Sequence, residues 1–133
     1  MSKSISERTD NVISSSDALV FLPGGIGTIY ELFTAIESKR CHEFNQPIII
    51  YNSNGYFDKL LAFMEKMYHE HFSESKDKEN YFVTTSISAI LYYINNYEKR
   101  KEDENCNSMR KINALKKEKS RCLSVLSLSL VVI

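Results

Sequence analysis

The sequence predicts an α/β protein with three layers, in which helices cover both faces of a parallel sheet. Short, continuous apolar runs end at turn-forming residues, as do strands that are buried on both faces. These runs alternate with segments whose apolar residues recur at helical spacing. Alternation of strand and helix favours right-handed βαβ crossovers, and these join parallel strands.

The first unit begins with the apolar run Ala18–Leu22 (ALVFL), which is closed by Pro23 and two glycines. This pattern predicts a short buried strand. Apolar side chains then recur at i, i+3, i+4 and i+7, namely Ile29, Leu32, Phe33 and Ile36. The unit is therefore expected to run from a strand through a glycine turn into a helix with one buried stripe.

The second strand is predicted at Pro47–Tyr51 (PIIIY), because the run is β-branched and is followed by the turn-forming residues 52–55. Helical spacing predicts a helix from Tyr56 to about His71. A third short strand is expected at Tyr81–Thr84, and Ser86 is suited to cap a helix that continues to about Tyr97.

Beyond Glu98 the composition becomes strongly charged and loses its apolar periodicity. Such a segment buries too little surface to offset its ordering entropy, so residues 98–133 are expected to form a disordered tail. Residues 123–133 alternate serine with leucine and valine, which allows either an adventitious strand or an aggregation-prone end. No function is assigned to the tail.

Charge and cysteine content exclude several classes of partner. The 133 residues carry no formal net charge, so no overall field attracts a polyanion, and no nucleic-acid partner is expected. Three cysteines without CxxC spacing argue against both a disulfide framework and a metal site, and favour a reducing, cytoplasmic location. The C-terminal apolar run has about eleven residues, where a membrane helix needs about twenty, so no membrane partner is expected.

The segment Pro23–Thr28 (PGGIGT) lies where the first strand gives way to the first helix. Free backbone N–H groups and the positive end of the helix converge there, which favours a phosphate. Gly24, Gly25 and Gly27 have no Cβ to keep an anion away from the backbone, and Thr28 offers a hydroxyl donor. The alternative is a tight turn without a ligand.

Two common phosphate motifs do not fit this segment. The GxxxxGK[ST] pattern is absent, and GxGxxG is incomplete because Tyr30 occupies the place of its third glycine. A mononucleotide or sugar phosphate is therefore favoured over a dinucleotide. Glu31 follows about one turn into the helix, where its carboxylate is suited to face a ribose and to polarise water or stabilise an oxocarbenium ion. The alternative is an ordinary acidic residue favoured by the helix dipole.

The segment from Ser6 to Arg40 resembles the LONELY GUY family, in which an arginine precedes a strand and the motif PGGxGTxxE follows it. The motif is matched by the six residues Pro23, Gly24, Gly25, Gly27, Thr28 and Glu31, and Arg8 stands at the place of the arginine. Without this resemblance, Arg8 would be interpreted as an ordinary surface residue. The likeness continues through QPIIIYNSNGYFDKLLAFMEKM and covers roughly residues 5–95.

The resemblance implies hydrolysis of the N-glycosidic bond of a cytokinin- or adenosine-type nucleoside 5'-monophosphate, which yields the free base and ribose 5-phosphate. It implies Arg8 and Glu31 as catalytic residues, and Gly24, Gly25, Gly27 and Thr28 as the phosphate- and nucleotide-binding residues. It also implies that no metal or organic cofactor takes part, and that the protein forms a homodimer if the chain is complete.

Family members carry an earlier strand and a glycine-rich turn, which are expected to be missing from this chain. Residues 1–97 are accordingly expected to form the C-terminal part of a Rossmann-like nucleotide-binding domain. Two functional hypotheses remain: a phosphoribohydrolase, or a truncated nucleotide-binding remnant without catalytic activity.

Overall fold

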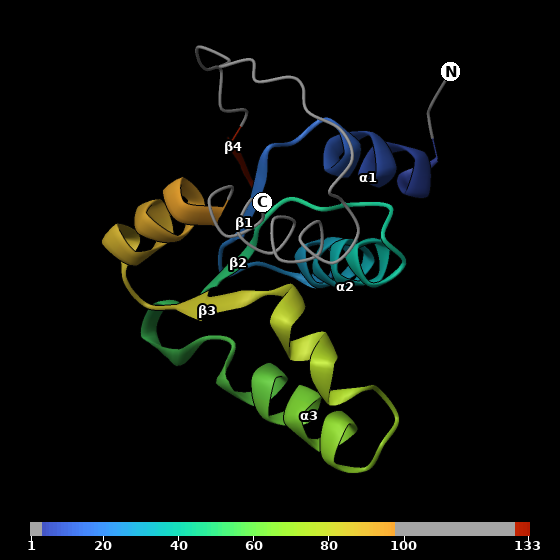
Figure 1. Cartoon of the computed structure of the whole chain (residues 1–133), viewed down its shortest axis with the longest axis vertical. Helices are drawn as coiled ribbons and strands as arrows, with labels where there is room; N and C mark the ends of the chain where they lie inside the picture. Colours follow the sequence, from blue (N-terminus) through green and yellow to red (C-terminus); the bar gives the residue numbers. More distant parts are fainter. Residues whose placement is uncertain (1–3, 98–129) are drawn as a thin grey trace, which may run out of the picture.

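Four parallel strands form the centre of the protein in the computed structural model, which describes residues 4–97 and 130–133 (Figure 1). The strands are β1 (Ala18–Phe21), β2 (Ile48–Tyr51), β3 (Phe82–Thr84) and β4 (Leu130–Val132). Their order across the sheet is β3-β2-β1-β4. The predicted α/β class with a parallel sheet is confirmed.

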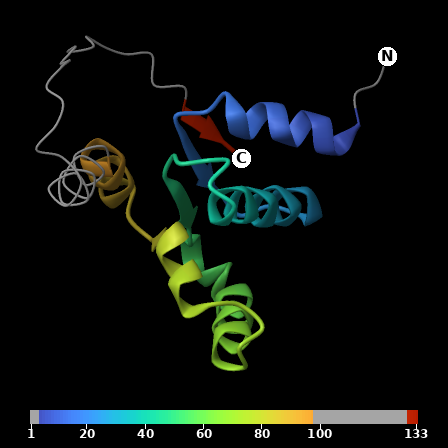
Figure 2. The same ribbon diagram turned by 45° about the vertical axis from the view of Figure 1, so that its right-hand side comes forward.

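Helices cover this sheet on both faces. The labelled helices are α1 (Ile5–Ser14), α2 (Ile26–Arg40) and α3 (Asp58–His69), with the short 3-10 helices η1 (Ser53–Gly55) and η2 (Ser75–Asn80). A further helix covers residues 87–97. Figure 2 shows α1 and α2 on one side of the sheet and the helix over residues 87–97 on the other, which makes three layers.

The side chains of β1 are divided between two apolar cores. Leu19 and Phe21, which are fully buried, face the core shared with α1, α2 and α3. Val20 points to the opposite face, where it packs with Ile49 of β2 and with Ile90. Successive residues of a strand point to opposite faces, so a strand that is apolar at every position needs a helical layer on each side.

The register of the sheet brings the carboxyl ends of its strands to one edge. Leu19 pairs with Ile48, and Ile50 of β2 pairs with Val83 of β3. The loops that follow β1 and β2 therefore leave the sheet side by side. In open α/β sheets this edge is where ligands bind.

Helix α1 was not assigned from the sequence, although its start carries a recognisable signal. The hydroxyl of Ser4 accepts a hydrogen bond from the N–H of Glu7 at 3.2 Å. Serine followed three residues later by glutamate is the pattern of a capping box. The inward face of this helix contributes Thr9 and Ile13, and the neighbouring Arg8 is exposed.

The turn after β2 is organised by a buried asparagine. Asn52 donates from Nδ2 to Oδ1 of Asp58 at 2.7 Å, and its own Oδ1 accepts from the N–H of Phe57 at 2.8 Å. Its N–H donates to the Thr84 carbonyl of β3 at 2.8 Å. These bonds satisfy polar groups that are costly to bury unpaired, and they hold the loop to the sheet edge.

Lys39, near the end of α2, links the two helical layers. Its buried ammonium group donates to the Gln46 carbonyl at 3.0 Å and to the Tyr97 hydroxyl at 2.7 Å. Nζ also lies 4.8 Å from the centre of the Tyr97 ring. Tyr97 belongs to the helix over residues 87–97 on the opposite face of the sheet, so this contact joins the helices of the two faces.

Most of the expected tail, residues 98–129, lies outside the described residues, and its disorder stays a prediction. The last residues form β4, which extends the sheet beside β1: Ile133 N–H donates to the Val20 carbonyl at 2.9 Å, and Leu22 N–H donates to the Ile133 carbonyl at 2.8 Å. Of the two outcomes expected for the end of the chain, the structure contains the strand.

Two histidines adopt the left-handed backbone conformation at the ends of helices. His71 follows α3 with φ of 63°, and His42 follows α2 with φ of 62°. The N–H of His71 donates to the Tyr68 carbonyl, and the N–H of Phe72 donates to the Met67 carbonyl. These are the bonds of a Schellman motif, a position where glycine is usual because a Cβ is disfavoured at positive φ.

Replacing His71 with glycine is expected to raise the free energy of unfolding by about 1 kcal/mol, because the left-handed conformation then costs less. Urea denaturation measures the change. His69→Gly is the matched control, since His69 is the last helical residue of α3 and glycine at a helical position lowers stability. Equal destabilisation by both substitutions would contradict the prediction.

Candidate active site

The glycine segment lies in the loop that leaves β1 at the carboxyl edge of the sheet. β1 ends at Phe21, and α2 begins at Ile26, so Leu22 to Gly25 form the connection. Gly25 is the N-cap of α2, with φ of −91° and ψ of −157°. The predicted order of strand, glycine turn and helix is confirmed.

The start of α2 has no side-chain cap. The first backbone hydrogen bond of the helix runs from the N–H of Ile29 to the Gly25 carbonyl at 3.2 Å. The N–H groups of the preceding first turn have no carbonyl within the helix to bind. They carry the positive end of the helix dipole, which attracts an anion.

The three glycines of the segment have different surroundings. A Cβ on Gly24 would overlap the hydroxyl group of Thr28. A glycine at this position therefore allows the Thr28 side chain to pack against the loop before α2. Apart from the adjacent residues of the chain and the backbone of α2 itself, a Cβ on Gly25 or on Gly27 would have no atom within 4 Å among the described residues. Internal packing explains Gly24, whereas the absence of side chains at Gly25 and Gly27 leaves open space against the backbone.

An apolar depression of about 520 Å³ lies next to the glycine loop. It is lined by Gly24, Gly25, Ile26, Ile29, Tyr30, Phe33 and Tyr56. Ile26 is 91% exposed and is the first residue of α2. Polar backbone groups beside an apolar surface are suited to a ligand with an anionic end and a flat or aliphatic part.

Tyr56, which the sequence analysis did not single out, comes to this loop from the neighbouring strand. Its hydroxyl donates to the Gly24 carbonyl at 2.6 Å. The two residues are 32 positions apart, so no local spacing indicates the contact. The available signal was the position of Tyr56 at the start of a predicted helix, directly after the turn that follows the second predicted strand and so at the same sheet edge as the glycines.

Arg8 and Glu31 lie on helices that contact each other, α1 and α2. Arg8 is exposed and Glu31 is half-buried. Within the described part of the chain, no hydrogen bond or ion pair joins them, and neither lines the apolar depression. The structure thus places both on the same side of the sheet without bringing their charged groups together.

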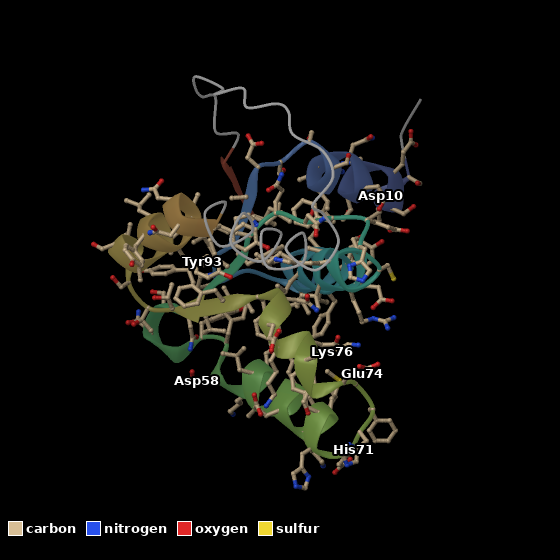
Figure 3. All side chains as sticks on the ribbon, viewed as in Figure 1. Asp10, Asp58, His71, Glu74, Lys76 and Tyr93 are labelled. Carbon is tan, nitrogen blue, oxygen red and sulfur yellow. The ribbon has the colours of Figure 1, made fainter. Side chains whose placement is uncertain are left out.

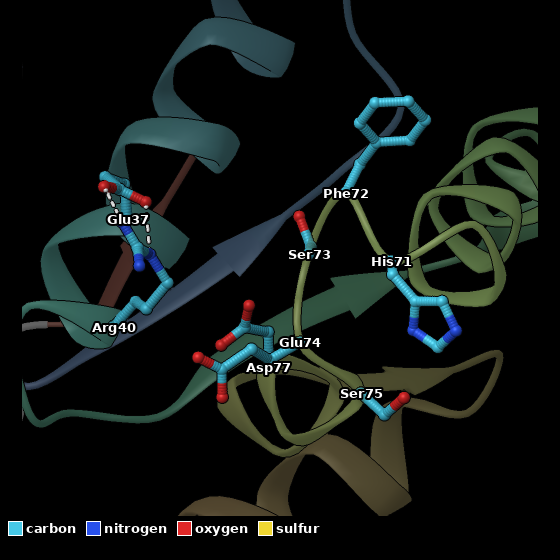
Figure 4. Close-up of a pocket in the computed structure, with 8 residues that line it drawn as sticks. All are labelled: Glu37, Arg40, His71, Phe72, Ser73, Glu74, Ser75 and Asp77. Atoms are coloured by element: carbon cyan, nitrogen blue, oxygen red, sulfur yellow. Dashed lines mark hydrogen bonds and ion pairs between the residues drawn. The ribbon is translucent and has the colours of Figure 1, made fainter.

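A second cavity, of about 560 Å³, lies between the end of α2 and the segment after α3, where Asp77 and Glu74 face the Glu37–Arg40 pair (Figure 4). Hydrogen bonds from Arg40 lower the pKa of Glu37. Glu74 pairs with Lys76 at 2.7 Å, and this hydrogen bond lowers the pKa of Glu74. Figure 3 labels both residues.

This second cavity lies at the amino edge of the sheet, whereas the site is predicted at the carboxyl edge. Since α2 and α3 start at the carboxyl edge, their C-terminal ends lie at the amino edge. Its ion pairs are exposed, and exposed pairs contribute little to stability. The glycine loop is therefore the better candidate for a binding site.

Residues 4–97 and 130–133 contain no group of three or more His, Cys, Asp and Glu side chains that is arranged to hold a metal ion. Across the same residues, no helix combines the length and the apolar character that crossing a bilayer requires.

Comparison with known proteins identifies relatives of this chain. A protein from Oryza sativa subsp. japonica, named "Probable cytokinin riboside 5'-monophosphate phosphoribohydrolase", is 32% identical over 94 residues, which is 71% of this chain and 38% of that protein. Two Arabidopsis thaliana proteins named "Cytokinin riboside 5'-monophosphate phosphoribohydrolase" are 32% identical over 91 residues and 28% identical over 96 residues. These alignments cover 68% and 72% of this chain, and 42% and 45% of the relatives.

The chain therefore spans about two-fifths of the length of these curated relatives. The family model described as "Possible lysine decarboxylase" matches residues 1–94, which include α1, the glycine loop and α2. With more than half of its residues inside that match, the chain belongs to the possible lysine decarboxylase family, the family of the LONELY GUY phosphoribohydrolases.

Proposed function

We propose that the glycine loop binds the phosphate of a nucleoside 5'-monophosphate of the cytokinin or adenosine type, and that the site hydrolyses its N-glycosidic bond. The main supporting observation is the position of the PGGxGTxxE motif. Its glycines lie at the start of a helix without a side-chain cap, at the carboxyl edge of a parallel sheet, and Glu31 lies on the same helix. The names of the relatives support this substrate class.

In the proposed reaction, water adds its hydroxyl group to the anomeric carbon of the ribose as the bond to the base breaks, and the departing base gains the remaining proton. The products are the free base and ribose 5-phosphate. Glu31 polarises the water or stabilises the oxocarbenium-like transition state, as carboxylates do in glycoside hydrolysis. Gly24, Gly25, Gly27 and Thr28 hold the phosphate.

Arg8 has the second catalytic role in this proposal. A guanidinium group binds phosphate or ribose oxygens in a bidentate manner, which a lysine does less well. Because Arg8 is exposed and lies on the helix that contacts α2, its long side chain is free to swing toward a bound nucleotide. The reaction uses no metal or organic cofactor, and we place it in the cytoplasm.

The second candidate function is nucleotide binding without catalysis. It is favoured by the lack of a hydrogen bond or ion pair between Arg8 and Glu31 among the described residues. In this case ribose 5-phosphate binds to the glycine loop, but no base is released. Measuring binding and turnover on the same preparation separates the two candidates.

Glu31→Gln is expected to reduce base release from AMP and from isopentenyladenosine monophosphate by about a hundredfold or more, the usual contribution of a general acid or base. Chromatography of free base and ribose 5-phosphate measures the rate. Glu37→Gln, at the far end of the same helix, is the control and should retain activity. A Glu31→Gln protein that is as active as the wild type would refute the catalytic role.

Gly27→Ala is expected to separate binding from stability. The new methyl group meets no atom from outside its own helix and chain neighbours among the described residues. Because alanine is also favoured over glycine in a helix, the free energy of unfolding should rise by up to about 1 kcal/mol. Affinity for ribose 5-phosphate should fall because the methyl group occupies the space of the anion. Calorimetric titration measures the affinity, and an unchanged value would remove Gly27 from the site.

Gly24→Ala is the comparison for this experiment. Its methyl group would overlap the Thr28 hydroxyl, so stability and binding should fall together.

We further propose that the chain forms a homodimer through the apolar surface around the loop. Ile26, Tyr30 and Leu22 are exposed there by 91%, 42% and 37%. Large apolar patches on a surface are typical of interfaces. Ile26→Ser is expected to weaken self-association by about tenfold or more in sedimentation experiments, since it removes a buried isoleucine from each copy. A wild-type chain that stays monomeric at high concentration would exclude this interface.

A further inference from the structure

A hydrogen bond joins the exit loops of the two central strands, β1 and β2. The Tyr56 hydroxyl is the donor and the Gly24 carbonyl is the acceptor, at 2.6 Å. Tyr56 also lines the apolar depression beside the loop. The bond therefore connects the β2 exit loop to the peptide unit immediately before the N-cap of α2.

The geometry of a peptide unit gives this bond a directional effect. The Gly24 carbonyl and the Gly25 N–H belong to one planar trans unit and point in opposite directions. A hydroxyl that holds the carbonyl oxygen on the Tyr56 side therefore turns the Gly25 N–H away from Tyr56. That N–H immediately precedes the unbonded N–H groups of the first turn of α2.

This peptide unit needs an external restraint because it lies between two glycines. Neither Gly24 nor Gly25 has a Cβ, so rotation of the unit meets little steric resistance. Thr28 packs against the Cα of Gly24 on one side. The Tyr56 hydroxyl holds the carbonyl and thereby fixes the remaining rotation.

Tyr56 is itself held by the sheet through its neighbour. Its ring packs edge-to-face on Phe57, with ring centres 5.1 Å apart, and Phe57 is almost completely buried. The N–H of Phe57 donates to the buried Asn52, which directly follows β2. A continuous series of contacts thus leads from the end of β2 to the Gly24 carbonyl.

We propose that Tyr56 is a positioning residue of the phosphate site, because its hydroxyl orients the Gly24–Gly25 peptide so that the Gly25 N–H faces the bound phosphate. The inference rests on the proposed function of the glycine loop and adds a residue from outside its motif. Tyr56 acts through the backbone and does not touch the reacting atoms.

The test is Tyr56→Phe in the full chain, which removes the hydroxyl and keeps the ring packing on Phe57. Titration with inorganic phosphate and with ribose 5-phosphate, followed by NMR of the backbone amides, measures the affinity. Loss of one hydrogen bond should weaken both ligands by about three- to tenfold and change the amide signal of Gly25 in the free protein. For nucleotide hydrolysis, KM should rise by the same factor, while kcat stays within about twofold.

Tyr92→Phe is the matched control, since Tyr92 is 67% exposed and lies on the helix that covers the other face of the sheet. It should leave affinity and the Gly25 amide unchanged. If the wild type binds phosphate and Tyr56→Phe binds it equally well with the same Gly25 signal, the positioning role is overturned. If the wild type itself binds no phosphate, the phosphate site of the proposed function fails, and this inference fails with it.

Discussion

Burial of β1 on both faces is the constraint on which the rest of the structure depends. Its four residues are apolar and almost fully excluded from solvent. Because alternate side chains point to opposite sides, the sheet needs α1, α2 and α3 on one face and the helix over residues 87–97 on the other. Each crossover then begins at the carboxyl edge, which brings the glycine loop and the loop of Tyr56 together.

The candidate site combines a rigid support with an open backbone surface. β1, Asn52 and Phe57 are buried, and they hold the ends of the two loops. The first turn of α2 is capped by no side chain, and the exposed apolar residues Ile26 and Tyr30 lie on the same helix. The exposed N–H groups can bind water, so leaving them without a protein partner does not reduce stability. They bind an anion more strongly where the adjoining surface is apolar.

The elements with strong periodicity were predictable from the sequence. The strands at residues 18–21 and 48–51 and the helix over Ile26–Arg40 follow from apolar runs and spacing, because tertiary packing agrees with local pattern there. Helix α1 has a weak hydrophobic signal because its buried positions are few: of its ten residues, Thr9 and Ile13 are buried. The capping pattern of Ser4 and Glu7 predicts the start of this helix better than its apolar periodicity does.

The site was predictable only as far as its residues are local in sequence. The glycine segment and the half-buried Glu31 lie on one strand–turn–helix unit, so their placement follows from that unit. The contact of Tyr56 with Gly24 depends on two loops that meet only in the folded sheet. The distance between the Arg8 and Glu31 side chains depends on how α1 packs against α2, which no spacing in the sequence determines.

The contact between Lys39 and Tyr97 has a consequence for motion. It ties α2 to the helix on the opposite face, close to the amino edge of the sheet, through a buried ammonium group with two hydrogen-bond acceptors. Separating the two layers there would break the hydrogen bond between a buried ammonium group and Tyr97, which is costly. Local opening of the fold is therefore expected to cost less at the carboxyl edge, where the glycine loop lies, than at the amino edge.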